Sequence, residues 1–372
     1  MPHLSALCGV FAFLLGLIPV AAPVTLARQA TPAAAATPVG DAPLLDAVVW
    51  LQAQQLPDGA FAGFDGRADP GVTADAVVAL RAAEVAGVAS GDALPRAVAD
   101  LEGRAAEAVA AGPGPSAKLT LAAVAGGRDP RSFGGVDLVA ALTEPVPAGT
   151  PVALEGAYGD DLYDHLVVVL ALIAAGEPVP PAALDLIRQT QAANGGWAFD
   201  GATAPEATDS NTTALAIQAL VGSGLPADAG ILDGSDLAND PAVVEGLAAL
   251  RGFQAPGGGF VFQPAEPPLP DANSTALAIQ AIVAVGQDPA SGEWGNAAAA
   301  LRGFANAGGG VRYVLADAAD NLFATLQAIP ALAGLPLPVA RLCQGEANNS
   351  VAGVAPRELA RITRCVELDP AA

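Results

Sequence analysis

The chain has few of the side chains that most often carry chemistry. Its 372 residues include three cysteines and two histidines, and Cys8 and His3 lie in an apolar N-terminal stretch. The remaining Cys343, Cys365 and His165 are too few for a zinc site built from thiolates and imidazoles. A serine or cysteine triad would depend on His165, and no G-x-S-x-G elbow accompanies it. We therefore expect neither a metal site nor a cofactor.

Basic and aromatic residues are also scarce. Lys and Arg total 16 against 38 Asp and Glu, which gives a formal charge of -22, and Lys118 is the only lysine. Such a charge disfavours phosphate backbones and anionic lipid surfaces, so we expect no nucleic-acid partner. Aromatics make up 5% of the chain and hydrophobic residues 52%. This composition predicts a large buried core rather than disorder for most of the chain.

The N-terminus is interpreted as a targeting signal followed by a linker. Residues 1–27 contain a long apolar run that ends in a small-x-Ala cleavage site, and residues 28–42 are rich in Ala, Thr and Pro. The prediction is a signal peptide at 1–27, a linker at 28–42 and a secreted or extracytoplasmic protein with no transmembrane segment after cleavage. The alternative is an uncleaved N-terminal anchor.

The most informative feature is an internal repeat. Residues 209–224 (DSNTTALAIQALVGSG) and 271–286 (DANSTALAIQAIVAVG) are identical at 11 of 16 positions and lie 62 residues apart. A turn with glycine and aromatic residues precedes each copy, and an apolar helix that ends in glutamine precedes the turn. Weaker copies occupy 44–87 and 297–333. The repeating unit is therefore helix, glycine turn, helix.

These units predict an all-α fold, an α6/α6 toroid over residues 43–335. Between 93 and 176 the turn signature fades, but apolar periodicity predicts helices at 94–111, 116–125, 136–142 and 160–175, which makes twelve helices in six pairs. One helix of each pair is apolar on all sides and its partner is amphipathic, as expected for an inner and an outer ring. The alternative, an open solenoid, needs polar capping repeats, and the first repeat has none.

The turns carry a family motif. Residues 191–197 (QAANGGW) fit Q-x3-G-x-W, and 55–61 and 254–260 are versions that end in phenylalanine. The motif resembles the repeat of squalene cyclases and other terpenoid cyclases, shared more loosely with protein prenyltransferase β subunits. Residues 118–142 and 161–176 are similar to the helical domain of the intrinsic factor and transcobalamin family. Both resemblances imply an α/α toroid.

The functional motifs of these families are incomplete here. Terpenoid cyclases of this kind protonate their substrate with D-x-D-D-T-A at the head of an inner helix. The matching residues 209–214 (DSNTTA) keep only the first aspartate and have Asn211 in place of the proton donor, and 271–276 (DANSTA) show the same loss. The resemblance also implies a second toroid, for which the chain is too short. The zinc ligands of the prenyltransferases are missing, and the 37 residues after Leu335 are too few for the clamping domain of intrinsic factor.

Polar residues collect at the predicted heads of the inner helices. If those helices run parallel, one mouth of the ring gathers the helix dipoles and a set of ligand-binding candidates: Asp161, Asp164, His165, Asp209, Asn211, Asp271, Asn273, Asp320 and Asn321. The alternative is that these side chains cap helices. We place Gln218, Gln280 and Gln327 at the same position of three inner helices. Their side chains are expected either to form a polar ring inside the apolar wall or to be ordinary buried amides with hydrogen-bond partners.

The last residues, 336–372, are expected to form a tail outside the toroid, because Pro336 and Pro338 follow the final repeat. Cys343 and Cys365 are the only cysteines left after signal cleavage. In an oxidising compartment two such thiols in a short segment are expected to pair as a disulfide.

Three functions are compatible with the sequence. The leading hypothesis is a secreted, non-catalytic toroid that binds a small molecule or an extracytoplasmic protein at its concave mouth. The second is a divergent terpenoid cyclase-like enzyme that uses Asp209 or Asp161 as its acid, and the third is a structural surface module. The second demands an aromatic cavity that protects carbocations, for which 5% aromatic residues are few.

Overall fold

The computed structural model describes residues 42–143, 154, 156–224 and 239–339. Six helices form an inner ring: α2 (Pro70–Val85), α5 (Pro113–Ala125), α7 (Leu162–Ala175), α9 (Ser210–Ser223), α11 (Ala272–Ala284) and α13 (Leu322–Leu332). Seven lie outside them: α1 (Ala42–Ala53), α3 (Ala93–Gly103), α4 (Ala105–Ala111), α6 (Leu138–Thr143), α8 (Pro181–Gln189), α10 (Pro241–Gly252) and α12 (Ala297–Gly303). The predicted signal peptide, nearly all of the predicted linker, and Cys343 with Cys365 lie outside the described residues.

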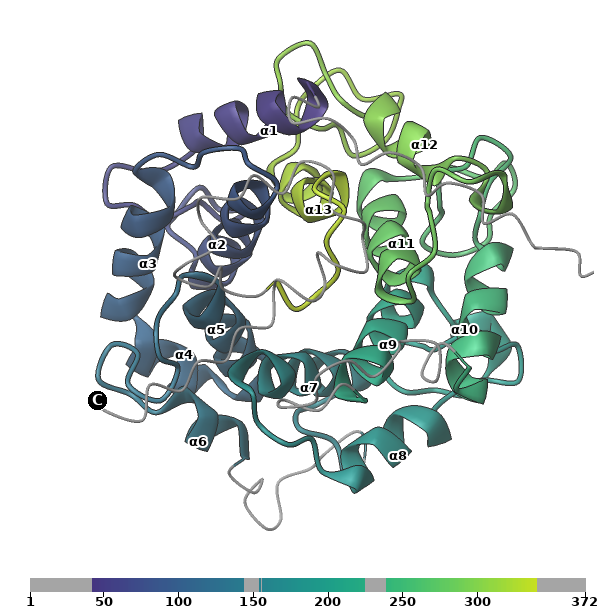
Figure 1. The fold of residues 1–372 in the computed structure, drawn as a ribbon, viewed down its shortest axis with the longest axis horizontal. Helices are drawn as coiled ribbons and strands as arrows, with labels where there is room; N and C mark the ends of the chain where they lie inside the picture. The colour runs from purple at the N-terminus through teal and green to yellow at the C-terminus, as the bar shows by residue number, and fades with distance from the viewer. Residues whose placement is uncertain (1–41, 144–153, 155, 225–238, 340–372) are drawn as a thin grey trace, which may run out of the picture. The chain divides into compact units, whose positions relative to one another are not determined.

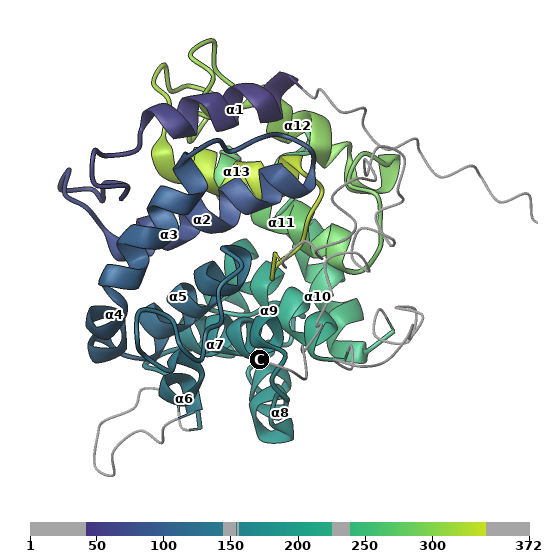
Figure 2. The same ribbon diagram turned by 60° about the vertical axis from the view of Figure 1, so that its left-hand side comes forward.

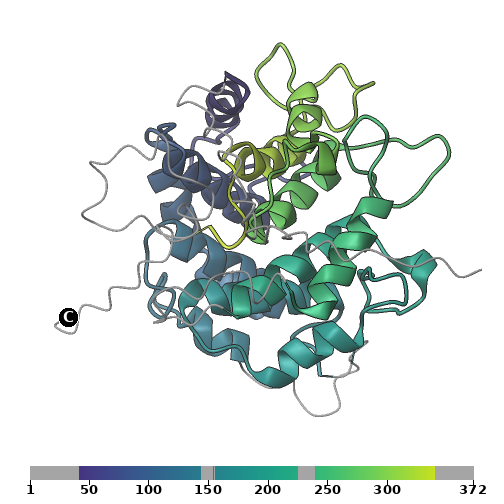
Figure 3. The ribbon, with the colours of Figure 1, turned by 45° about the vertical axis from the view of Figure 1, so that its right-hand side comes forward.

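The inner helices form a closed ring (Figure 1). Each packs against the next in the order α2, α5, α7, α9, α11 and α13, and α13 packs against α2. The outer helices lie along the outside in both turned views (Figures 2 and 3). In the described part of the chain the β structure is limited to isolated bridges in turns. The predicted all-α toroid is confirmed.

The two rings differ in burial as their sequences predict. In α9, every residue but Asn211 from Ser210 to Val221 is buried, because the helix touches neighbours on both sides, an outer helix behind it and side chains of the lumen. In α8, only Ala183 and Ile187 are buried, which is the narrow apolar stripe of an outer helix.

Some boundaries differ from the prediction. The single helix predicted at 94–111 is two helices, because Gly103 favours a break and Arg104 leaves helical geometry with φ -112° and ψ 6°. The predicted tail also starts too early. Leu335 and Val339 are buried against Ala82 and Val85 of α2, so the segment after α13 belongs to the ring.

The glutamines of the turn motif connect consecutive repeats. The Nε2 group of Gln191 donates to the carbonyl of Gly195 in its own turn at 2.8 Å and to that of Ala242 in the next outer helix at 2.9 Å. Gln55 and Gln254 make the same pair of bonds, the former to Gly59 and Ala93 and the latter to Gly258 and Trp294. Each glutamine thus joins its turn to the following repeat.

The turn glycine is required by backbone geometry and by space. Gly195 has φ +85°, and a Cβ there would press into the carbonyl of Glu245 in the next outer helix. In the last repeat Gly309, with φ +97°, takes the same position against Asp46 of α1. The last turn therefore packs on the first outer helix as the other turns pack on their successors, and this contact closes the ring.

We expect Gln191→Ala to lower the free energy of unfolding by about 1–3 kcal/mol, because it leaves two part-buried carbonyls without their donor. Gln189→Ala, two residues earlier at an exposed position, is the matched control and should change stability by less than about 0.5 kcal/mol. Urea unfolding monitored by circular dichroism measures both. Equal stability of the two variants would contradict the connecting role of the glutamine.

Candidate functional site

Polar side chains cap the inner helices at one end of the ring. Asp69, Asp161, Asp209, Asp271 and Asn321 are the N-caps of α2, α7, α9, α11 and α13, and each side chain accepts a hydrogen bond from a backbone N–H of the first turn. Gly112 holds this place before α5. Contacts between the heads of neighbouring helices show that the six run in one direction. Their N-termini surround one opening, called the mouth below.

Both carboxylate oxygens of Asp209 and of Asp271 accept hydrogen bonds at the head of their own helix. One oxygen of Asp209 accepts from the backbone N–H of Thr212 at 2.7 Å and the other from its hydroxyl at 2.8 Å. Asp271 has the equivalent bonds from Ser274. Burial raises the pKa of both carboxyl groups, as an acid would require, but both face the helix backbone. These contacts fit the capping interpretation.

The N-cap of each inner helix fixes which of its residues face the lumen. Helical periodicity places the second and sixth residues after each cap on one face, one turn apart. The second residues are Gly71, Gly114, Tyr163, Asn211, Asn273 and Phe323; the sixth are Asp75, Lys118, Val167, Leu215, Leu277 and Gln327. Six of these twelve residues line one cavity.

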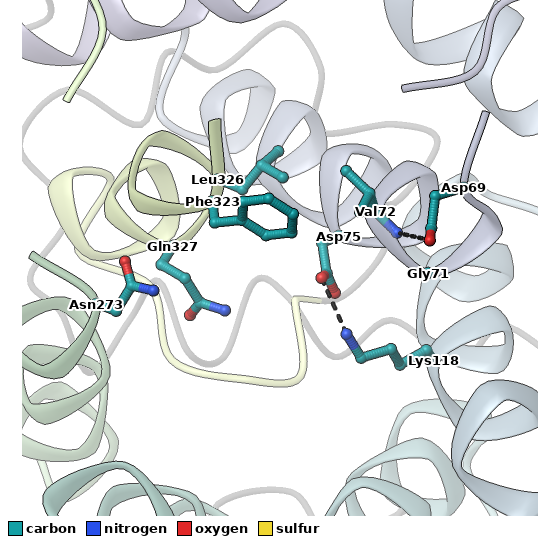
Figure 4. A pocket seen from close by; sticks show the side chains of 9 residues that line it. All are labelled: Asp69, Gly71, Val72, Asp75, Lys118, Asn273, Phe323, Leu326 and Gln327. Carbon is teal, nitrogen blue, oxygen red and sulfur yellow. Dashed lines mark hydrogen bonds and ion pairs between the residues drawn. The ribbon is translucent and has the colours of Figure 1, made fainter. Parts of the chain in front are cut away.

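This lumen cavity has a volume of about 220 Å³ and is lined by Asp69, Gly71, Val72, Asp75, Lys118, Asn273, Phe323, Leu326 and Gln327. Asp75 and Lys118 face Gln327 and Asn273 across it (Figure 4). Its polar groups come from α2, α5, α11 and α13. The sixth residues of α7, α9 and α11, by contrast, are Val167, Leu215 and Leu277. The lumen therefore has a polar sector and an apolar sector.

An ion pair dominates the polar sector. Lys118 Nζ lies 3.0 Å from the carboxylate of Asp75, and the attraction of Asp75 raises the pKa of Lys118 against the opposing effect of burial. Tyr163 of α7 is close enough for Lys118 to act on its hydroxyl, although burial is the larger effect and raises the pKa of Tyr163. The only lysine of the chain is thus held inside the ring as a cation with N–H groups to spare.

Asn273 supplies an unused acceptor. Its Oδ1 is buried and has no hydrogen-bond partner in the described structure, while its residue lines the lumen cavity. An unpaired buried polar atom costs about 1–3 kcal/mol. Because the atom is enclosed by protein, a bound molecule could donate to it only after the amide of Asn273 rotates toward the cavity.

The other predicted residues are not part of the lining of this cavity. His165 is buried between the rings: its Nε2 contacts the carbonyl of Ala183 at 3.0 Å and its Nδ1 accepts from the N–H of Tyr158. Burial lowers its pKa, so it stays neutral. Burial raises the pKa of Asp164, which packs close to Gly114 and Gly159. Asp320 precedes the cap of α13 and packs against turn glycines, and the Oδ1 of Asn211 accepts from Ser210.

The three glutamines do not form one ring. Gln218 and Gln280 stand nine residues after their caps, whereas Gln327 stands six after Asn321, so it lies about one turn nearer the mouth. The expectation of one shared position was wrong, because α13 begins later than the repeat pattern predicts. Gln218 Oε1 accepts from the N–H of Leu337 at 2.8 Å. Residues 335–339 therefore touch both α2 and α9, on opposite sides of the ring, and cross the lumen beyond the cavity.

Sequence reasoning missed Asp69, Asp75, Lys118 and Phe323 as site residues. The second repeat lacks the turn motif, and the first repeat is a weaker copy in which only the turn and the helix bounds were matched to the later repeats. One signal was present: Asp69 and Thr73 have the spacing of Asp209 and Thr213, and in both pairs the threonine hydroxyl donates to the carbonyl of the cap.

Among the described residues, no group of three His, Cys, Asp or Glu side chains is placed to hold a metal ion. In that same part of the chain, no helix has the length and apolar character needed to cross a membrane.

No protein-family model matches the chain, and no curated protein matches it. Solved structures do. A variant of the type II terpene cyclase MstE from Scytonema, bound to its substrate geranylgeranyl dihydroxybenzoate, is 18% identical with a TM-score of 0.56, and the alignment covers 78% of this chain and 96% of that one. A protein from Actinoplanes is 16% identical with a TM-score of 0.54, covering 78% and 98%. A glycosidase is 14% identical with a TM-score of 0.50, covering 79% and 98%.

These likenesses show the fold, an α/α toroid like that of terpenoid cyclases and of glycosidases. They also correct one inference from the sequence. A single ring aligns with almost the whole of a type II terpene cyclase chain, so the lack of a second toroid does not count against a cyclase.

Replacement of Asp209 by alanine tests the capping role. Because the variant leaves the Thr212 N–H and hydroxyl without an acceptor, we expect Asp209→Ala to destabilise the ring by about 1 kcal/mol. Glu206→Ala, at an exposed position nearby, should be neutral. Thermal unfolding compares the two; an unchanged melting temperature in Asp209→Ala with loss of a measured turnover would instead favour Asp209 as a catalytic acid.

Proposed function

We propose that the protein is a non-catalytic toroid that binds a small polar molecule in the lumen cavity. The observation that carries this is the set of polar groups gathered from four inner helices around one cavity, with the Oδ1 of Asn273 unpartnered. Lys118 donates to Asp75 and has further N–H groups for a ligand. A cationic, an anionic and two neutral hydrogen-bonding side chains therefore converge on one small cavity.

The size and lining of the cavity argue against a polyprenyl substrate. Its 220 Å³ is below the roughly 300–1,000 Å³ typical of sites for drug-sized ligands. Phe323 is the single aromatic residue in its lining, which gives little stabilisation to a carbocation. A compact, hydrogen-bonding molecule fits these walls better than a long apolar chain.

A terpenoid cyclase-like enzyme is the second candidate, because its fold likeness extends over nearly a whole cyclase chain. Protonation of an alkene requires a carboxylic acid that faces the lumen. The lumen-facing head positions of α9 and α11 hold the amides Asn211 and Asn273, which cannot supply that proton. Asp209 and Asp161 are engaged as caps, and Asp75 is paired with an ammonium group.

The polar lining of the cavity also argues against a purely structural module. A purely structural module would leave the half-buried ion pair of Asp75 and Lys118, which lines the lumen cavity, without a role. Export of the protein remains part of the proposal and rests on the composition of residues 1–27. The ligand would then be a molecule found outside the cytoplasm.

Thermal stabilisation by small molecules tests the binding role. Purified protein is screened at millimolar concentration against sugars, polyols, amino acids and small organic acids. At a hundredfold excess over Kd, a ligand that binds the folded state adds about 2.7 kcal/mol, or about 4 °C in Tm for a ring of this size. We expect at least one such ligand, and loss of its effect in Lys118→Met and in Gln327→Leu.

Arg188→Met is the matched control, because it removes an ion pair with Asp240 that joins two outer helices. Its response to the ligand should equal that of the wild type. Absence of any stabilising compound that depends on Lys118 would contradict the proposal. If the protein converts a geranylgeranyl substrate, and Asp209 or Asp161 is needed for the conversion, the cyclase hypothesis would replace the binding hypothesis.

A further inference from the structure

The exposed aromatic side chains of the described residues all lie around the mouth. They are Phe64, Phe199, Phe262 and Tyr313, which we call the aromatic rim, with exposed fractions of 92%, 51%, 44% and 41%. Each lies in a turn that leads into an inner helix. The other aromatic residues of the described chain are buried or half-buried. Exposed apolar side chains gathered in this way mark a binding surface.

The rim is held rigidly. The carbonyl of Phe199 accepts from the N–H groups of Leu162 and Tyr163 at the head of α7, and the carbonyls of Phe262 and Tyr313 accept from the heads of α9 and α11. The ring of Phe64 stacks on Phe323 of α13, with centroids 4.0 Å apart. A surface that is fixed before binding loses little conformational entropy when it takes a ligand.

Each rim residue contacts the head of one of four consecutive inner helices: Phe199 that of α7, Phe262 that of α9, Tyr313 that of α11 and Phe64 that of α13. Neighbouring helix axes in packed pairs are about 8–10 Å apart, so we expect the rings to recur at intervals of that order, comparable with the length of a disaccharide. Repeated flat apolar surfaces suit a ligand that is itself repetitive and has apolar faces.

Planar polar residues follow three of the rings in the chain: Asp65 after Phe64, Asp200 after Phe199 and Gln263 after Phe262. Each aspartate uses one oxygen within its own turn, and Gln263 donates to the carbonyls of Ala207 and Thr208. The second oxygen of Asp200 and the Oε1 of Gln263 have no hydrogen bond to them among these contacts. Pyranose sugars present an apolar C–H face on one side and hydroxyl groups at the edge. An aromatic ring can pack on the C–H face while a planar carboxylate or amide hydrogen-bonds to the hydroxyl groups. The net charge of -22 disfavours an acidic chain.

We propose that the mouth binds a neutral saccharide chain, which lies along the aromatic rim with its terminal sugar in the lumen cavity. The second half of this statement rests on the proposed binding role of the cavity. The cavity suits a sugar, because Asp75, Lys118, Asn273 and Gln327 offer both donors and acceptors and every sugar hydroxyl is both. Phe323 links the two parts, since it lines the cavity and stacks with Phe64.

Isothermal titration calorimetry with cello-, xylo-, manno- and N-acetylchitohexaose tests the proposal. We expect at least one hexasaccharide to bind, and the double variant Phe199→Ala with Phe262→Ala to weaken its affinity at least tenfold. The double variant Phe199→Tyr with Phe262→Tyr keeps the rings and should bind as the wild type does. Leu45→Ala with Val244→Ala, which removes exposed apolar side chains from outer helices, should also leave binding unchanged.

The remaining outcomes separate this inference from the function on which it rests. No binding of any hexasaccharide, binding that does not change in the alanine rim variant, or rim-dependent binding of a decaproline peptide in its place would each overturn the saccharide proposal. A stabilising small ligand that depends on Lys118 would then still support the cavity. Rim-dependent hexasaccharide binding that Lys118→Met does not weaken would instead overturn the role of the cavity and keep the rim.

Discussion

The ring depends on the contact of glycine turns with the next repeat, which Gly59, Gly195, Gly258 and Gly309 make. No single helix pair can bury its inner helix, because that helix is apolar on all sides and needs neighbours on both flanks. The glutamine of one turn binds the backbone at or just before the start of the following outer helix, and the glycine allows the two backbones to approach. Because the last turn meets α1 in the same manner, the last repeat is joined to the first.

Ring closure determines what the lumen contains. Six parallel helices bring their N-termini to one opening, and the caps set the register of the side chains below it. The second and sixth residues after each cap form two layers, and the differences between repeats make one sector polar and the other apolar. The segment that follows α13 crosses the lumen at a deeper level, so ligands are expected to enter from the mouth. A binding site thus results from small differences between repeats that share one backbone.

Much of the fold could be predicted from the sequence, because the two near-identical copies at 209–224 and 271–286 reveal the unit and its period. The capping of α9 and α11 could also be predicted, since Asp before Ser or Thr at a helix head has a direct physical reason. The roles of Asp75 and Lys118 could not. Lys118 lies in a repeat without the turn motif and Asp75 in one of the weaker copies, and their convergence depends on the register of α2 against α5, which tertiary packing sets. Likewise, nothing in the composition of residues 335–339 distinguishes a lumen-crossing segment from the start of a tail.

We propose that the lumen cavity holds a polar ligand rather than a catalytic acid. A crystal structure of the protein as purified, and a second one with the carbohydrate panel added, would show what occupies the cavity. We expect an ordered molecule other than water that contacts Lys118 or Gln327 and the amide of Asn273. A lumen filled by the protein's own side chains, or a polyprenyl chain lying beside an unpaired carboxyl group, would contradict it.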